Sequence, residues 1–159
     1  MPAACPPQPP SNTVLLKGPN MPQLPLQLLR APLPDSADEA GVLRLSNDAD
    51  LQAVDLHQVR RIELNFPKFT DGRAYSQAWR LRRRHGFEGD IRACGDVRVD
   101  QLQQMARSGF SSAVLIEGQD LALGQQLLSR FHGFYQGDAL HAQPHFQPAT
   151  GSQASGGAA

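Results

Sequence analysis

The polar side chains best suited to chemistry lie where an apolar segment gives way to a helical pattern. They are, in chain order, Asn65, Lys68, Asp71, Gly72 and Arg73, and Asp96 follows the next apolar segment. A helix N-terminus favours anions through its unpaired N–H groups and dipole, and Lys68 and Arg73 would strengthen binding of a phosphate or carboxylate group. The pattern predicts a small-anion site at the carboxyl ends of two strands. The alternative is that Asp71 caps the helix and occupies those N–H groups itself.

A second set of charged residues alternates with apolar residues along three predicted strands. Because successive side chains of a strand point to opposite faces, Arg44, Glu63 and Arg92 would share one sheet face with Asn65 and Cys94. This row is either a polar binding floor or a ladder of cross-strand ion pairs, each pair contributing roughly 0.2–1 kcal/mol. A parallel sheet covered on both sides is usually apolar on both faces. We therefore expect the polar face to be solvated, to line a cavity or to be covered by a partner.

The helical pattern from Arg73 to about His85 is rich in arginine. Its core-facing residues are predicted to be Ala74, Ala78, Leu81 and His85. Arginines beside Tyr75 and Trp79 could bind single-stranded nucleic acid. The net charge of zero and the lack of a known RNA motif favour a solvated face or a protein-docking surface instead.

Short strand patterns alternate with helix patterns along the middle of the chain. The strands are predicted at Val42 to Leu45, Ile62 to Phe66, Ile91 to Cys94 and Ala113 to Ile116. The helices are predicted after Ser46 to about Val54, from Arg73 to His85, after Asp96 to Ser108, and from Leu121 to Tyr135. Repeated βα order predicts the α/β class, with one small domain built on a mostly parallel sheet of four to five strands.

Two of these helices end in similar motifs, Arg84-His85-Gly86-Phe87 and Arg107-Ser108-Gly109-Phe110. The glycine of each motif can adopt the left-handed conformation that ends a helix, and the phenylalanine can pack back on the last turn.

Composition sets the bounds of the folded part. Ten of the 13 prolines fall in residues 1–34, which predicts an extended or disordered segment, although Leu24 to Leu33 could pack along the domain edge. Residues 40–136 are predicted to fold, and residues 137–159 have the composition of a disordered tail. No apolar run is long enough to span a membrane. Cys5 and Cys94 form no disulfide framework, which indicates a cytoplasmic protein, and Cys94 is interpreted as a small apolar residue rather than a reactive thiol.

The run FPKFTDGRAYSQAWRLRRRHGFEGDIRACGDV, followed by DQL and RSGF, resembles the bacterial family called domain of unknown function 934. The resemblance covers roughly Gly41 to Gln136. Its FPKFTDGR corresponds to Phe66 through Arg73, and its GDV to residues 95–97. The sequence departs from the family pattern at Ala74, usually glycine, at Ser108, usually cysteine, and at Arg98-Val99, usually Leu-Arg.

The resemblance implies a role in assimilatory sulfite reduction, where members are often described as oxidoreductases without an assigned reaction. Three functions are then open. The first is an accessory protein that binds sulfite reductase or another sulfur-assimilation enzyme, a small anion, or both. The second is an enzyme of the same pathway whose site is at the strand ends. The third is an RNA-binding module that uses the arginine-rich helix. No motif assigns a cofactor or a metal, and the exposed edges of a small sheet favour a homodimer.

Overall fold

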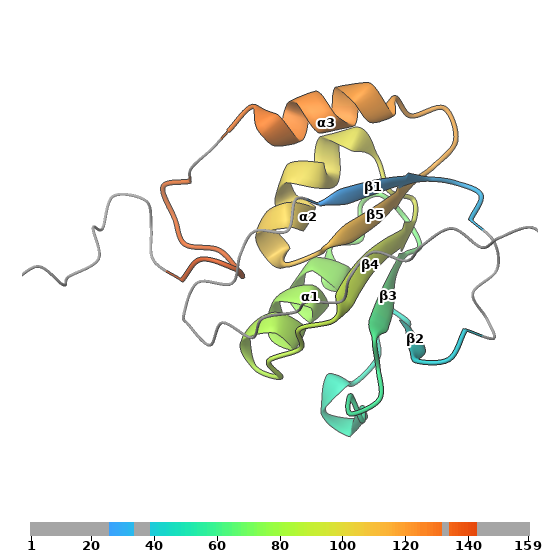
Figure 1. The fold of residues 1–159 in the computed structure, drawn as a ribbon, viewed down its shortest axis with the longest axis vertical. Coiled ribbons are helices and arrows are strands. Elements are labelled where there is room, and N and C mark those ends of the chain that lie inside the picture. The colour runs from blue at the N-terminus through green and yellow to red at the C-terminus, as the bar shows by residue number, and fades with distance from the viewer. Residues whose placement is uncertain (1–25, 34–38, 132–133, 143–159) are drawn as a thin grey trace, which may run out of the picture.

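The computed structural model describes residues 26–33, 39–131 and 134–142. Five strands form one parallel sheet in the order β1-β5-β4-β3-β2 (Figure 1). Their bounds are β1 Gln27–Arg30, β2 Val42–Leu45, β3 Arg61–Phe66, β4 Asp90–Gly95 and β5 Ser112–Leu115. Most of the sequence predicted to form disordered tails lies outside the described residues.

The three α-helices of the described residues all lie on the same face of the sheet (Figure 1). They are α1 Arg73–Arg83, α2 Leu102–Ser108 and α3 Leu121–Ser129, and two short 3-10 helices are η1 Leu51–Ala53 and η2 Val99–Gln101. From β2 to β5 each strand takes the place beside the previous one, always in the same direction. Right-handed crossovers then put every connecting helix on one side. The predicted fold class is confirmed. No helix in the described part of the chain is long and apolar enough to cross a membrane.

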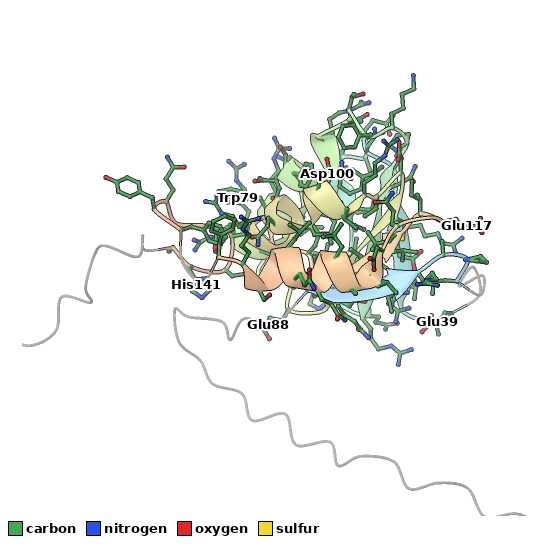
Figure 2. The ribbon with its side chains drawn as sticks, turned by 90° about the horizontal axis from the view of Figure 1, so that it is seen from above. Glu39, Trp79, Glu88, Asp100, Glu117 and His141 are labelled. Carbon is green, nitrogen blue, oxygen red and sulfur yellow. The ribbon has the colours of Figure 1, made fainter. Side chains whose placement is uncertain are left out.

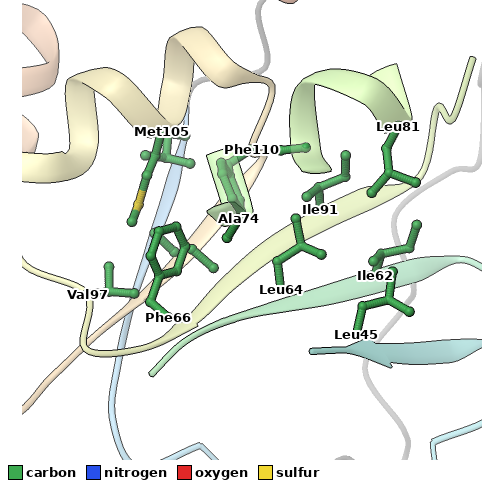
Figure 3. Close-up of a cluster of buried hydrophobic side chains, with 14 of the residues drawn as sticks. Leu45, Ile62, Leu64, Phe66, Ala74, Leu81, Ile91, Val97, Met105 and Phe110 are labelled. Atoms are coloured by element: carbon green, nitrogen blue, oxygen red, sulfur yellow. The ribbon is translucent and has the colours of Figure 1, made fainter. Parts of the chain in front are cut away.

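The core lies between the sheet and this helical layer (Figure 3). Ile62, Leu64 and Phe66 of β3 are fully buried, as the alternation along the strand predicts. The Phe66 ring packs edge-on against Tyr75 of α1 at 5.1 Å between centroids, and against Phe110 at 5.8 Å. Phe66 thus joins the end of β3 to α1 and to the segment that follows α2.

The two repeated helix ends have the predicted conformation. Gly86 and Gly109 have φ of +62° and +99°, and the N–H groups of Phe87 and Phe110 donate to carbonyls five to six residues back, at Leu81 and Met105. Both phenylalanines are buried.

Arg82 fills the space between these two helix ends. Its guanidinium donates to the carbonyls of Gly109, Phe87 and Gly89 at 2.7–2.8 Å. Burial lowers the pKa of Arg82 to about 10, and the nearby Asp90 opposes that shift. The side chain therefore stays charged at neutral pH while serving as an internal donor to the backbone.

Several boundaries differ from the sequence prediction. A 3-10 turn, capped by Asp50 through the N–H of Gln52, stands where a helix to Val54 was predicted. The last helix ends at Ser129 rather than Tyr135, because its final N–H, from Arg130, bonds three residues back to Leu127 instead of four.

The two ends of the chain add described structure beyond residues 40–136. β1 pairs with β5 at the sheet edge. It lies within Leu24 to Leu33, the segment that the sequence allowed to pack along the edge of the domain. Residues 137–142 were assigned to the tail by composition. In the structure Ala139 is buried and its N–H donates to the Arg107 carbonyl at 2.9 Å, while Asp138 accepts from the N–H groups of Leu140 and His141.

Candidate binding site at the carboxyl edge of the sheet

Two loops meet at the carboxyl edge because β3 and β4 are neighbours. Residues 67–72 connect β3 to α1, and residues 96–98 connect β4 to η2. Gly95 has φ of +96°, and a Cβ there would lie 2.3 Å from the Phe66 carbonyl oxygen. Only glycine allows this close approach, which lets the Asp96 N–H donate to the same oxygen at 2.8 Å. The second loop is therefore anchored on the end of β3.

The first loop is held at Phe69 by both of its backbone polar groups. Its N–H donates to Asp96 Oδ2 at 3.0 Å, and its carbonyl accepts from Gln101 Nε2 at 3.2 Å. The Phe69 ring is 38% exposed, and the guanidinium of Arg98 lies over it at 4.9 Å. Arg98 is in turn fixed by Asp96, with 2.9 Å between Nε and Oδ1. Phe69, Asp96, Arg98 and Gln101 are called the rim cluster below.

Gln101 links the two loops from a buried position. Its Oε1 accepts from the Arg98 N–H at 3.0 Å, while its Nε2 reaches the Phe69 carbonyl. Both ends of one buried amide are thus used to position the rim. The result is an aromatic ring and a cation presented to solvent on a backbone that is fixed at both loops.

At the start of α1, where the anion site was predicted, the chain itself takes one backbone N–H group, that of Arg73. Asp71 Oδ1 accepts from the Arg73 N–H at 3.1 Å, and Arg73 Nη2 pairs with Asp71 Oδ2 at 2.7 Å. Asn47 also donates to Asp71. Hydrogen bonds from the side chain and then the backbone of Arg73 lower the pKa of Asp71 to about 2. This geometry matches the alternative interpretation, in which Asp71 takes the N–H group that an anion would need.

The structure places the remaining predicted site residues near one another without joining their side chains. Asn65 is exposed at the end of β3, and Lys68 is exposed in the loop. Asp96 contacts the loop through the Phe69 N–H, but its carboxylate pairs with Arg98 rather than with Lys68 or Arg73. Sequence reasoning missed Phe69, Arg98 and Gln101 as site residues. The signal available was that Phe69 is an aromatic residue inside a polar loop sequence.

A family model described as "Bacterial protein of unknown function (DUF934)" matches residues 42–146. The chain belongs to this family. No curated protein and no solved structure matches it. The matched region runs from β2 past α3, so the whole rim of the DUF934 chain lies within it.

The polar face of the DUF934 sheet carries the predicted charged row. Arg44 Nε lies 3.0 Å from Glu63 Oε2, and Arg92 Nη1 lies 3.8 Å from Glu63 Oε1. Arg92 Nε also donates to Ser112 on β5 at 3.2 Å. The row therefore forms a ladder across four strands, and it is separate from the rim cluster. No α-helix of the described chain lies on this face (Figure 1).

Asp90 completes the ladder at the start of β4. Its carboxylate accepts from Ser112 at 2.8 Å and from Arg61 Nε at 3.0 Å, and it lies 3.5 Å from Arg92 Nη2. Each charged group of this face thus has a partner on a neighbouring strand, which is the arrangement of a structural ladder.

Cys94, on the same face, is predicted to be unreactive in the folded DUF934 chain. Burial, followed by the charge of Glu63, raises the pKa of its thiol to about 11 from an ordinary 9.0. Since the thiolate is the nucleophile, we expect iodoacetamide at pH 8 to alkylate Cys94 about a hundredfold more slowly in the folded protein than in urea. Peptide mass spectrometry over time measures both rates. Equal rates would show that the fold does not suppress the reactivity of the thiol.

A cavity of about 940 Å³ opens at the amino-terminal edge of the sheet, opposite the edge that carries the rim cluster. Its lining includes Leu26, Arg61, Asp90 and Ser111 at the starts of strands, together with Phe131 and Phe134 beyond α3. Arg107 stands over the Phe134 ring at 4.4 Å. No pattern in the sequence indicated this hollow, because it depends on the return of residues 134–142 to the ends of the strands.

Proposed function

We propose that this DUF934 chain is an accessory protein of bacterial assimilatory sulfite reduction, and that it contacts a partner enzyme of that pathway through the rim cluster. The pathway comes from the family resemblance of the FPKFTDGR segment. The observation that carries the binding role is Phe69, whose N–H and carbonyl are both fixed by side chains of the neighbouring loop while its ring stays exposed. Fixed aromatic side chains beside an arginine are typical anchors of protein interfaces.

Binding fits the chemistry of the rim better than acid–base or nucleophilic catalysis does. The carboxylates of Asp71 and Asp96 are each held by an arginine two residues away, and both have lowered pKa values because of those hydrogen bonds. A general base works best with a pKa near the operating pH. The raised pKa of Cys94 disfavours a thiolate nucleophile in the same way.

The proposal predicts that Phe69→Ala weakens capture of sulfite reductase by at least about tenfold, as expected for an interface anchor. Arg98→Ala should act in the same direction, because it removes the cation over the ring. The measurement is co-purification of tagged chain and sulfite reductase from the same bacterium at matched expression, followed by titration of the purified pair.

Leu123→Ala is the matched control, since Leu123 is a similarly exposed apolar residue on α3, at 43%. It should capture the enzyme as the wild type does. Failure of the wild type to form the complex would contradict the accessory role. A complex that tolerates Phe69→Ala would leave that role standing and contradict the rim as its surface.

A further inference from the structure

Trp79 is the one tryptophan of the chain, and it stands on the outer side of α1 with 44% of its surface exposed (Figure 2). It lines a groove of about 320 Å³ between α1 and α2, together with Tyr75, Ser76, Arg80, Gln104 and Ser108. None of these residues belongs to the rim cluster. A large aromatic side chain left at the wall of a groove is typical of an interaction surface.

The arginines of this helix are not equivalent. Arg73 is paired within its own turn, Arg82 is engaged with internal carbonyls, and Arg83 donates to a backbone carbonyl at 2.8 Å. Arg80 and Arg84 are exposed, and neither side chain has a hydrogen bond or ion pair with another described residue. Arg84 directly follows α1 in helical conformation, and its backbone N–H donates to the Arg80 carbonyl at 2.8 Å, so the two side chains are neighbours one turn apart.

Carboxylates are scarce around the groove. No Asp or Glu occurs from residue 73 to 87 or from residue 101 to 116. Asp100 lies near the Tyr75 end, where its charge adds to burial in raising the pKa of the Tyr75 hydroxyl. Glu39 and Glu117 lie toward the other side of the molecule from Trp79 (Figure 2). No carboxylate of the described residues belongs to the groove lining, whose one formally charged residue is Arg80, so the groove is locally positive although the whole chain is neutral.

We propose that the groove around Trp79 is a docking surface for an acidic segment of a partner protein. An apolar side chain of that segment packs against Trp79, and its carboxylates pair with Arg80 and Arg84. Single-stranded RNA fits less well, because its binding uses a track of cations along several phosphates together with stacked bases. Here one cation, Arg80, lines the groove beside one exposed indole, and a second, Arg84, lies one turn beyond it. This surface goes beyond the rim proposed above and does not depend on it.

Trp79 itself reports on the groove, since its fluorescence is the only tryptophan signal. The probe is a synthetic peptide of about three helical turns, without aromatic residues, that carries one central leucine surrounded by Asp and Glu. We expect it to shift the Trp79 emission to the blue and to saturate. A peptide with Asn and Gln in place of the acids should bind at least about tenfold more weakly at low salt.

Charge-removing variants locate the contact. Arg80→Gln with Arg84→Gln should weaken the acidic peptide about fivefold, because two exposed ion pairs are lost. The matched control removes the same charge from β1 and from the end of α3, as Arg30→Gln with Arg130→Gln, and should leave binding unchanged. An unshifted emission, equal binding of the neutral peptide, or equal weakening by both double variants would overturn the proposal. Tighter and more salt-dependent binding of an oligouridylate of the same length would replace it with an RNA surface.

Discussion

Replacing Arg82 with methionine is expected to lower the free energy of unfolding by about 3 kcal/mol, because three internal carbonyls lose their donor at once. Those carbonyls belong to Phe87, Gly89 and Gly109, which connect α1 to β4 and α2 to β5. Methionine keeps the apolar stem of the side chain, so the effect isolates the guanidinium. Urea unfolding followed by circular dichroism measures it.

Two further variants test this assignment of Arg82. Arg82→Lys retains the charge but cannot reach three carbonyls with one nitrogen, and we expect it to recover only part of the loss. Arg84→Ala removes an exposed arginine from the end of the same helix and should change stability by less than about 0.5 kcal/mol. If Arg82→Met unfolds at the same urea concentration as Arg84→Ala, the carbonyls have other donors and Arg82 is not structural.

The alternation of residue types in the strands was enough to predict which of their side chains face the core. Ile62, Leu64 and Phe66 face the helices, and Glu63 faces away, as the period of two requires. Strand order was not predicted; in the structure β2 to β5 lie side by side in chain order, as short βα units favour. The glycines that end the helices could be predicted from the local sequence, because few other residues adopt the left-handed conformation at low cost.

The predicted core-facing residues of α1 show a limit of prediction from hydrophobic periodicity. His85 was predicted to lie in the core, but α1 ends at Arg83 and the residue is exposed. Gln77, which was not among the predicted core residues, is buried instead. Its Nε2 donates to the Ser46 carbonyl at 2.9 Å. A buried amide with a distant backbone partner cannot be recognised from hydrophobic spacing.

The rim cluster could not be predicted for the same reason. Its contacts join Phe69 to Asp96 and Gln101, which are 27 and 32 residues away along the chain. The sequence marked the loop as polar and suggested its charges as ligands. In the structure Asp71 and Asp96 are committed to Arg73 and Arg98, so the loop residues left to interact include the aromatic Phe69 as well as the exposed Lys68. Which side chains satisfy one another depends on tertiary contacts that residue types alone do not specify.

The second large effect is expected at Glu63, where the two interpretations of the polar face give opposite results. If the row is a ladder, Glu63→Ala removes one of the two carboxylates beside the buried Arg92 side chain, which is only 12% exposed, and leaves it with Asp90 at 3.5 Å. Removing one partner of a buried ion pair costs about 3 kcal/mol. If the row is instead a floor kept for a ligand, the free protein should tolerate Glu63→Ala with little loss of stability.

A paired substitution separates the lost ion pair from a simple loss of packing. Glu63→Leu combined with Arg92→Leu should restore most of the stability that Glu63→Ala loses, because apolar residues of similar volume often replace a buried ion pair at little cost. Asp90 would keep Arg61 and Ser112 as partners in that variant, so no new unpaired carboxylate arises. Urea unfolding of the single and double variants gives the coupling energy directly. If the double variant is as unstable as Glu63→Ala, the charged side chains do more than pair with each other. A binding floor would then describe the polar face better than a ladder.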